Sequence, residues 1–296
     1  MKSEKNILIA FILNLSFSIF EFFGGIFTGS IAIVSDAVHD IGDATSIGVS
    51  FFLERKSKKR PNEKYTYGYL RYSVLGSTIT TLILILGSIM VICTAITRIV
   101  APMPINYDGM IIFALVGVCI NFTAALLTCK SKSLNQKAVN LHMLEDVLGW
   151  IAVLLAALIM RFTNFYLIDP LISIGVAIFI LINAVKMLKK VLNIFLEKAP
   201  HGINTNDITA HIVEIEGVLD VHHIHIWSMD GYNNYATMHI VTNEDPYTIK
   251  SKIREELKKH GIAHSTLEFE TANEECYQKN CNTNFDIVQK EHHHHH

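Results

Sequence analysis

The stretch "SDAVHDIGDATS", residues 35–46, places four ionisable side chains within about two helical turns of an otherwise apolar segment. They are Asp36, His39, Asp40 and Asp43. An ionisable group near the middle of a bilayer costs about 2.5–3.5 kcal/mol on the insertion scale, so such groups are kept where they pair, face water or bind something. His39 and Asp43 would share one face of a helix, and so would Asp36 and Asp40, because each pair is spaced i, i+4. The spacing alone leaves both pairs possible.

A second His-x-x-x-Asp pattern lies in "NLHMLEDVLGW", residues 140–150, where it is formed by His142 and Asp146. A single copy is more often a local hydrogen-bonded pair, but two copies in membrane segments favour a metal site. Two such pairs on facing helices supply two imidazoles and two carboxylates, a set that suits tetrahedral Zn²⁺. Imidazole favours zinc and its transition-metal neighbours over Mg²⁺ and Ca²⁺, which prefer oxygen ligands.

The composition indicates a membrane protein with a soluble domain attached. Of 296 residues, 50% are hydrophobic and 18% are charged, whereas a soluble domain has about 25% charged residues. The apolar residues concentrate before about residue 196 and the charged residues after about residue 198. We predict a transmembrane transport domain at 1–198, a cytoplasmic metal-binding and dimerisation domain at 199–283, and a tail at 284–296 that ends in a purification tag.

Six stretches are long enough to cross a bilayer as helices, which takes about 20 residues. They lie at roughly 6–27, 31–53, 70–98, 107–129, 137–161 and 166–188. Lys and Arg flank these stretches at alternate ends, at the N-terminus, in the loops near 54–64 and 130–137, and after 186. Because cytoplasmic loops carry the excess of Lys and Arg, we predict that both termini and the soluble domain are cytoplasmic.

The soluble domain is predicted to be a two-layer α+β domain with the element order αββαβ. The predicted elements are a helix at 204–214, strands at 218–229 and 234–242, a helix at 246–261 and a strand at 263–271. His211 and His260 fall on the predicted helices and are interpreted as surface or helix residues without a function.

Histidines cluster on the predicted strands. Strict alternation along the first strand would place His223 and His225 on one face and His222, with Ile224 and Ile226, on the other. From the residues alone, these histidines are metal ligands or polar strand residues at a dimer interface.

Several stretches together resemble the cation diffusion facilitator family, in its zinc-transporting branch. The two His-x-x-x-Asp segments resemble the family's signatures in the second and fifth spans. Further matching stretches are "NLSFSIFEFFGG" in the first span, "IFLEKAPHGI" in the linker and "VHHIHIWSM" in the soluble domain. The resemblance implies a homodimer in the bacterial cell membrane that exports Zn²⁺ from the cytoplasm in exchange for protons. The same ligands would also serve Cd²⁺, Co²⁺ and Fe²⁺, so the sequence does not distinguish these metals. No nucleic-acid partner is expected.

The resemblance also assigns residues. It implies that the transport site consists of His39, Asp43, His142 and Asp146, which selects the His39 and Asp43 pair over the alternative in the same segment. In the soluble domain it implies zinc ligands at His222, His239 and Glu270. The tail is similar to those that donate thiolates in some members, through Cys276 and Cys281.

Two positions depart from the family pattern. Ser73 stands where many members have a glutamate, which puts a charge pairing there in doubt, and Tyr65 and Tyr69 stand where some bacterial relatives have two loop histidines. We therefore expect no metal site in that loop.

A membrane zinc hydrolase is disfavoured because no H-E-x-x-H motif is present and four protein ligands would close the site. A passive metal channel and a metal sensor that transports nothing are the remaining alternatives.

Overall fold

The chain folds into two compact units, Met1–Asn193 and Ile194–His296. The computed structural model describes residues 2–28, 31–101, 107–129, 133–163 and 167–274.

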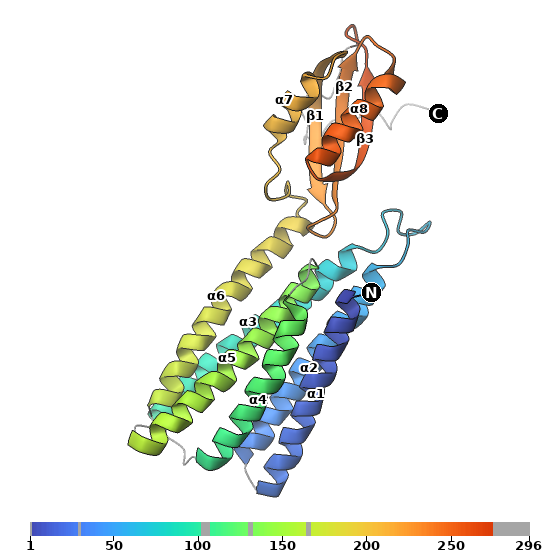
Figure 1. Ribbon diagram of the computed structural model, residues 1–296. Helices are drawn as coiled ribbons and strands as arrows, with labels where there is room; N and C mark the ends of the chain where they lie inside the picture. The colour runs from blue at the N-terminus through green and yellow to red at the C-terminus, as the bar shows by residue number, and fades with distance from the viewer. Residues whose placement is uncertain (1, 29–30, 102–106, 130–132, 164–166, 275–296) are drawn as a thin grey trace, which may run out of the picture. The chain divides into compact units, whose positions relative to one another are not determined.

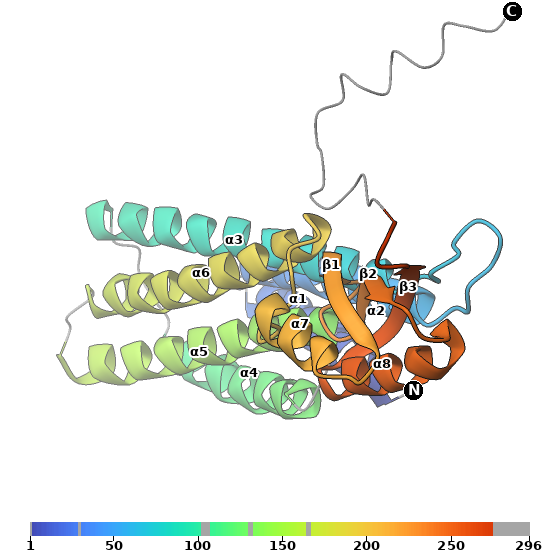
Figure 2. The same cartoon turned by 90° about the horizontal axis from the view of Figure 1, so that it is seen from above.

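The first unit is a bundle of long helices that run side by side (Figure 1, Figure 2). Its helices are α1 (Lys2–Thr28), α2 (Ile31–Ser57), α3 (Arg71–Val100), α4 (Tyr107–Thr128), α5 (Leu134–Thr163) and α6 (Ile168–Phe195). Five of them carry an apolar stretch long enough to cross a membrane, at Lys5–Gly24, Arg71–Val100, Ile111–Thr128, Leu134–Ile159 and Pro170–Phe195. The described part of α2 carries no such stretch, because Asp40, Asp43 and Glu54 interrupt its apolar sequence.

Small and branched side chains bring α2 and α5 together in the bundle. One buried cluster contains residues of α1, α2, α4 and α5: Ile7, Ala10, Ile47, Ala124, Ala125, Val139, Met143 and Val147. Close contact between α4 and α5 depends on Gly117, where an added Cβ would lie 2.6 Å from Cδ2 of Trp150. The apolar contacts thus hold the two helices that carry the His-x-x-x-Asp patterns in one bundle.

A buried carboxylate at one end of the bundle connects three helical segments. Glu54, near the end of α2, is 3% exposed. Its Oε2 accepts hydrogen bonds from Ser73 Oγ at 2.9 Å and from Ser133 Oγ at 2.8 Å, and Lys58 Nζ lies 3.8 Å from its Oε1. Ser73 lies in the first turn of α3, and Ser133 directly precedes α5. The serine that departs from the family pattern therefore contacts a carboxylate of the preceding helix.

The second unit consists of a three-stranded sheet and two helices. In chain order these are α7 (Thr205–Val213), β1 (Val218–Ser228), β2 (Asn234–Thr242), α8 (Pro246–Lys259) and β3 (Ile262–Glu270). Strand β2 is central, antiparallel to β1 and parallel to β3. Asn204 and Asp245 cap the two helices by accepting hydrogen bonds from backbone N–H groups of the first turn.

Helices α7 and α8 cover one face of this sheet (Figure 1). The core between them is apolar and includes Ile208, Ile212, Val221, Ile226, Met238, Ile240, Ile249, Ile253 and Leu257. The opposite face of the sheet carries the polar side chains.

The predicted division of the β1 histidines between two faces is wrong. The pairing with β2 shifts register between His222 and His225, and His223 has a φ of 50°. This bulge places an extra residue in β1. His222 pairs with His239 and His225 with Thr237, on the face away from α7 and α8, while Ile226 pairs with Ala236 in the core. The sequence pattern missed the bulge because a non-glycine residue at positive φ is uncommon.

Candidate metal centres

Three ionisable side chains from α2 and α5 converge inside the first unit. They are Asp43, His142 and Asp146, and one ligand atom of each lies within 4.8 Å of the other two. His142 Nε2 is 3.8 Å from Asp43 Oδ2 and 4.0 Å from Asp146 Oδ2. Asp43 is 8% exposed and His142 is 3% exposed. The structure therefore brings together three of the four side chains that the two sequence patterns predicted.

The separations from His142 Nε2 are too long for hydrogen bonds and leave room for an ion. They exceed the 2.7–3.2 Å of an ordinary hydrogen bond, and His142 Nε2 is buried without a hydrogen-bond partner among the described residues. In a tetrahedral zinc site, ligand atoms about 2.0–2.1 Å from the ion are about 3.3 Å apart. The two separations from His142 Nε2 would have to shorten by less than 1 Å to reach that spacing.

The fourth predicted ligand is His39, which belongs to α2 one turn before Asp43. Its side chain, like that of Asp36, lies outside the side chains that the structure describes. Asp40 is described, and the cluster contains Asp43 rather than Asp40. His39 therefore stays a prediction, and its i, i+4 spacing from Asp43 is the argument for it.

Glu145 lies on the other side of the His142 ring. Its Oε2 is 3.9 Å from His142 Nδ1, and its Oε1 accepts a hydrogen bond of 3.2 Å from Ser88 Oγ on α3. At 3.9 Å this contact is an ion-pair distance and not a hydrogen bond, so Glu145 places a carboxylate near the ring without fixing its orientation. Neither His-x-x-x-Asp pattern indicates this contact, although the i, i+3 spacing of His142 and Glu145 is a signal for it.

A second group lies on the sheet of the second unit, on the face opposite α7 and α8. It consists of His222 on β1, His239 on β2 and Glu270 at the end of β3. His222 Nε2 is 3.2 Å from Glu270 Oε2, and His239 Nδ1 is 2.5 Å from Glu270 Oε1. One carboxylate thus contacts both imidazoles, and the strand pairing brings together residues far apart in sequence. The two predicted thiolate ligands, Cys276 and Cys281, lie outside the described residues.

Comparisons with known proteins agree with this arrangement of two units. The family described as "Cation efflux transmembrane domain" matches residues 7–196, and the family described as "Cation efflux protein, cytoplasmic domain" matches residues 200–272. The chain is 32% identical over 303 residues to a cadmium, cobalt and zinc/H(+)-K(+) antiporter of Bacillus subtilis, covering 99% of this chain and 97% of the relative.

Two further relatives are similar over most of their length. Zinc transporter ZitB of Pectobacterium atrosepticum is 32% identical over 302 residues, covering 99% of this chain and 91% of the relative. Metal cation efflux system protein CzcD of Cupriavidus metallidurans is 30% identical over 277 residues, covering 91% of this chain and 87% of the relative.

Proposed function

The chain belongs to the cation efflux family, and from this premise we propose that it exports Zn²⁺ from the cytoplasm in exchange for protons. Membership makes it a multi-pass membrane transporter and not an enzyme, as the sequence motifs predicted. Similar proteins are named for zinc, cadmium and cobalt. Cd²⁺, Co²⁺ and Fe²⁺ are proposed as further substrates, because the same imidazole and carboxylate ligands bind all of them.

The proposed transport site is the group on α2 and α5, and the observation that carries it is the approach of Asp146 to the buried Asp43 and His142. His39 would supply the fourth ligand. Two carboxylates would neutralise the charge of a divalent cation, which matters in a medium of low dielectric constant. The site would lie in a membrane spanned by all six long helices, with α2 tolerated despite its charges because it is packed against α1, α3 and α5.

Proton exchange follows from the chemistry of these ligands. A histidine binds zinc only when it is neutral and an aspartate only when it is ionised, so protons and metal compete for the same atoms. An unperturbed imidazole titrates at about pH 6.5, which makes the exchange feasible near neutral pH. Zinc would enter from the cytoplasm, the helices would move to open the site outward, and protons would displace the ion.

For the second unit we propose dimerisation and metal sensing in the cytoplasm of a bacterial cell. The domains would span 1–198 and 199–283, with both termini on the cytoplasmic side. His222, His239 and Glu270 would bind a regulatory Zn²⁺, because they offer two imidazoles and one carboxylate on a sheet face that α7 and α8 leave uncovered.

Zinc uptake into proteoliposomes with an imposed pH gradient tests the proposal. Wild-type protein should accumulate zinc against its gradient, whereas Asp146→Ala should lose this uptake because one ligand is gone. Asp40→Asn is the matched control, since it removes a charge from α2 that is not part of the cluster. Unchanged flux in Asp146→Ala would refute the site. Zinc flux that does not depend on the pH gradient would indicate a channel. Zinc binding without any zinc flux would indicate a sensor.

A further inference from the structure

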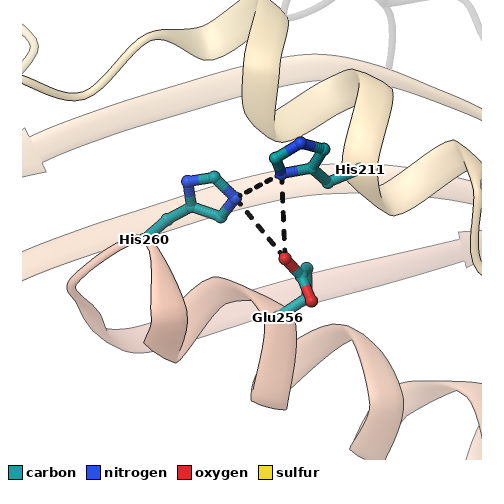
Figure 3. Close-up of side chains that lie close together, drawn as sticks. All are labelled: His211, Glu256 and His260. Atoms are coloured by element: carbon teal, nitrogen blue, oxygen red, sulfur yellow. Dashed lines mark hydrogen bonds and ion pairs between the residues drawn. The ribbon is translucent and has the colours of Figure 1, made fainter.

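A third group of potential ligands lies on the helices of the second unit. It consists of His211 on α7, Glu256 on α8 and His260 at the C-terminal end of α8 (Figure 3). Neither histidine has a predicted function. Figure 3 shows the two rings and the carboxylate pointing toward one another from the two helices.

The three ligand atoms form a triangle of the size that a metal ion requires. His211 Nδ1 is 2.8 Å from His260 Nε2, and Glu256 Oε1 is 3.8 Å from His211 Nδ1 and 3.6 Å from His260 Nε2. The point that lies in the plane of the three atoms at equal distance from them is about 2.0 Å from each, which is the bond length of zinc to imidazole nitrogen and carboxylate oxygen. The two nitrogens are closer than the about 3.3 Å between ligands of a tetrahedral site, so the rings would move apart by about 0.5 Å when the ion replaces their hydrogen bond.

The surroundings orient the carboxylate and leave one side of the group open. Lys259 Nζ donates a hydrogen bond of 2.8 Å to Glu256 Oε2, so the other oxygen, Oε1, faces the imidazoles. The side chain of His211 is 49% exposed, whereas those of Glu256 and His260 are 20% and 23% exposed. A fourth ligand would therefore be water, as in zinc sites with three protein ligands.

We propose that His211, Glu256 and His260 form a Zn²⁺-binding site that links α7 to α8. Its ligands come from the layer of helices, while His222, His239 and Glu270 lie on the opposite face of the sheet. Because its ligands come from two helices that pack on different strands, β1 and β3, the bound ion would cross-link the helical layer. Zinc would then stabilise the folded second unit.

Residue-resolved labelling of histidines tests this site in the full chain, purified in detergent with residues 292–296 removed so that the terminal histidines do not bind metal. Diethyl pyrocarbonate labelling of each histidine is measured by mass spectrometry across a ZnCl₂ titration. At a zinc concentration ten times the dissociation constant, about nine-tenths of the sites are occupied, so labelling of His211 and His260 should fall about tenfold. His201, which is exposed and outside the group, should keep its labelling rate.

Two glutamate variants separate metal binding from a simple contact between histidines. Glu256→Gln should shift zinc protection of His211 and His260 to at least about tenfold higher zinc, because the carboxylate ligand is lost. Glu255→Gln, an exposed neighbour on the same helix, should leave the protection unchanged. Labelling of His211 and His260 that does not respond to zinc, or protection that is the same in Glu256→Gln and wild type, would overturn the proposal. Neither result depends on transport.

Discussion

Replacing Ser73 by alanine tests whether the buried carboxylate of Glu54 holds the helices of the first unit together. The Ser73 hydroxyl donates to Glu54 Oε2 at 2.9 Å, in a place where Glu54 is 3% exposed and Ser73 is 7% exposed. A hydrogen bond to a charged group contributes about 1.5–3 kcal/mol. Ser133 still donates to the same oxygen, so we expect Ser73→Ala to lower the free energy of unfolding by about 2 kcal/mol.

Replacing both serines provides a stronger test than replacing Ser73 alone. Ser73 and Ser133 donate to one oxygen and lie 3.0 Å from each other. Removing both leaves Oε2 of a buried carboxylate without these donors, so the double variant should lose more stability than the sum of the single losses, by about 0.5–3 kcal/mol.

Equilibrium unfolding in mixed micelles, followed by far-ultraviolet circular dichroism, measures these losses. Thr78→Ala is the matched control, because the Thr78 hydroxyl bonds to the Val74 carbonyl within α3 and connects no helices. If Ser73→Ala were as stable as Thr78→Ala, and the two serine losses simply added, the reasoning about a shared carboxylate would be refuted.

Other predictions concern the transport site and the two packed cores. Glu145→Gln should raise the zinc KM of proteoliposome uptake by about 10–100-fold, because the His142 ring loses the carboxylate near its second nitrogen; an unchanged KM would show that Glu145 does not support zinc binding. Gly117→Ala should lower the free energy of unfolding in micelles by about 1–3 kcal/mol, since its new methyl group overlaps Trp150. A variant as stable as the wild type would show that α4 and α5 can move apart to make room for the methyl group. Met238→Ala should destabilise the second unit by about 2–5 kcal/mol, because this side chain is 1% exposed in the core. Limited proteolysis of that unit would report the change, and unaltered cleavage would contradict it.

The sequence predicted the parts of the fold that depend on local pattern. Helical stretches and the αββαβ order of the second unit follow from periodicity and turn residues over short segments. Two copies of His-x-x-x-Asp were enough to indicate which helices would meet.

What the sequence could not predict depends on contacts between distant residues. The position of Glu145 beside Ser88 requires the packing of α5 on α3, and the approach of His211 to His260 brings together residues 49 positions apart. The β1 bulge depends on one backbone conformation, that of His223, which alternation cannot indicate. In each case the position of the side chain depends on tertiary contacts, which the local sequence pattern does not contain.

The bulge in β1 also changes how many imidazoles one strand can offer. A regular strand presents a side chain to a given face about every 6.7 Å. Here the ring of His223 lies 4.8 Å, centroid to centroid, from both His225 and His239. The unusual backbone conformation of one residue, His223, thus brings several imidazoles close together on this surface. In a chain with the same histidines but a regular strand, some of these side chains would point into the hydrophobic core instead.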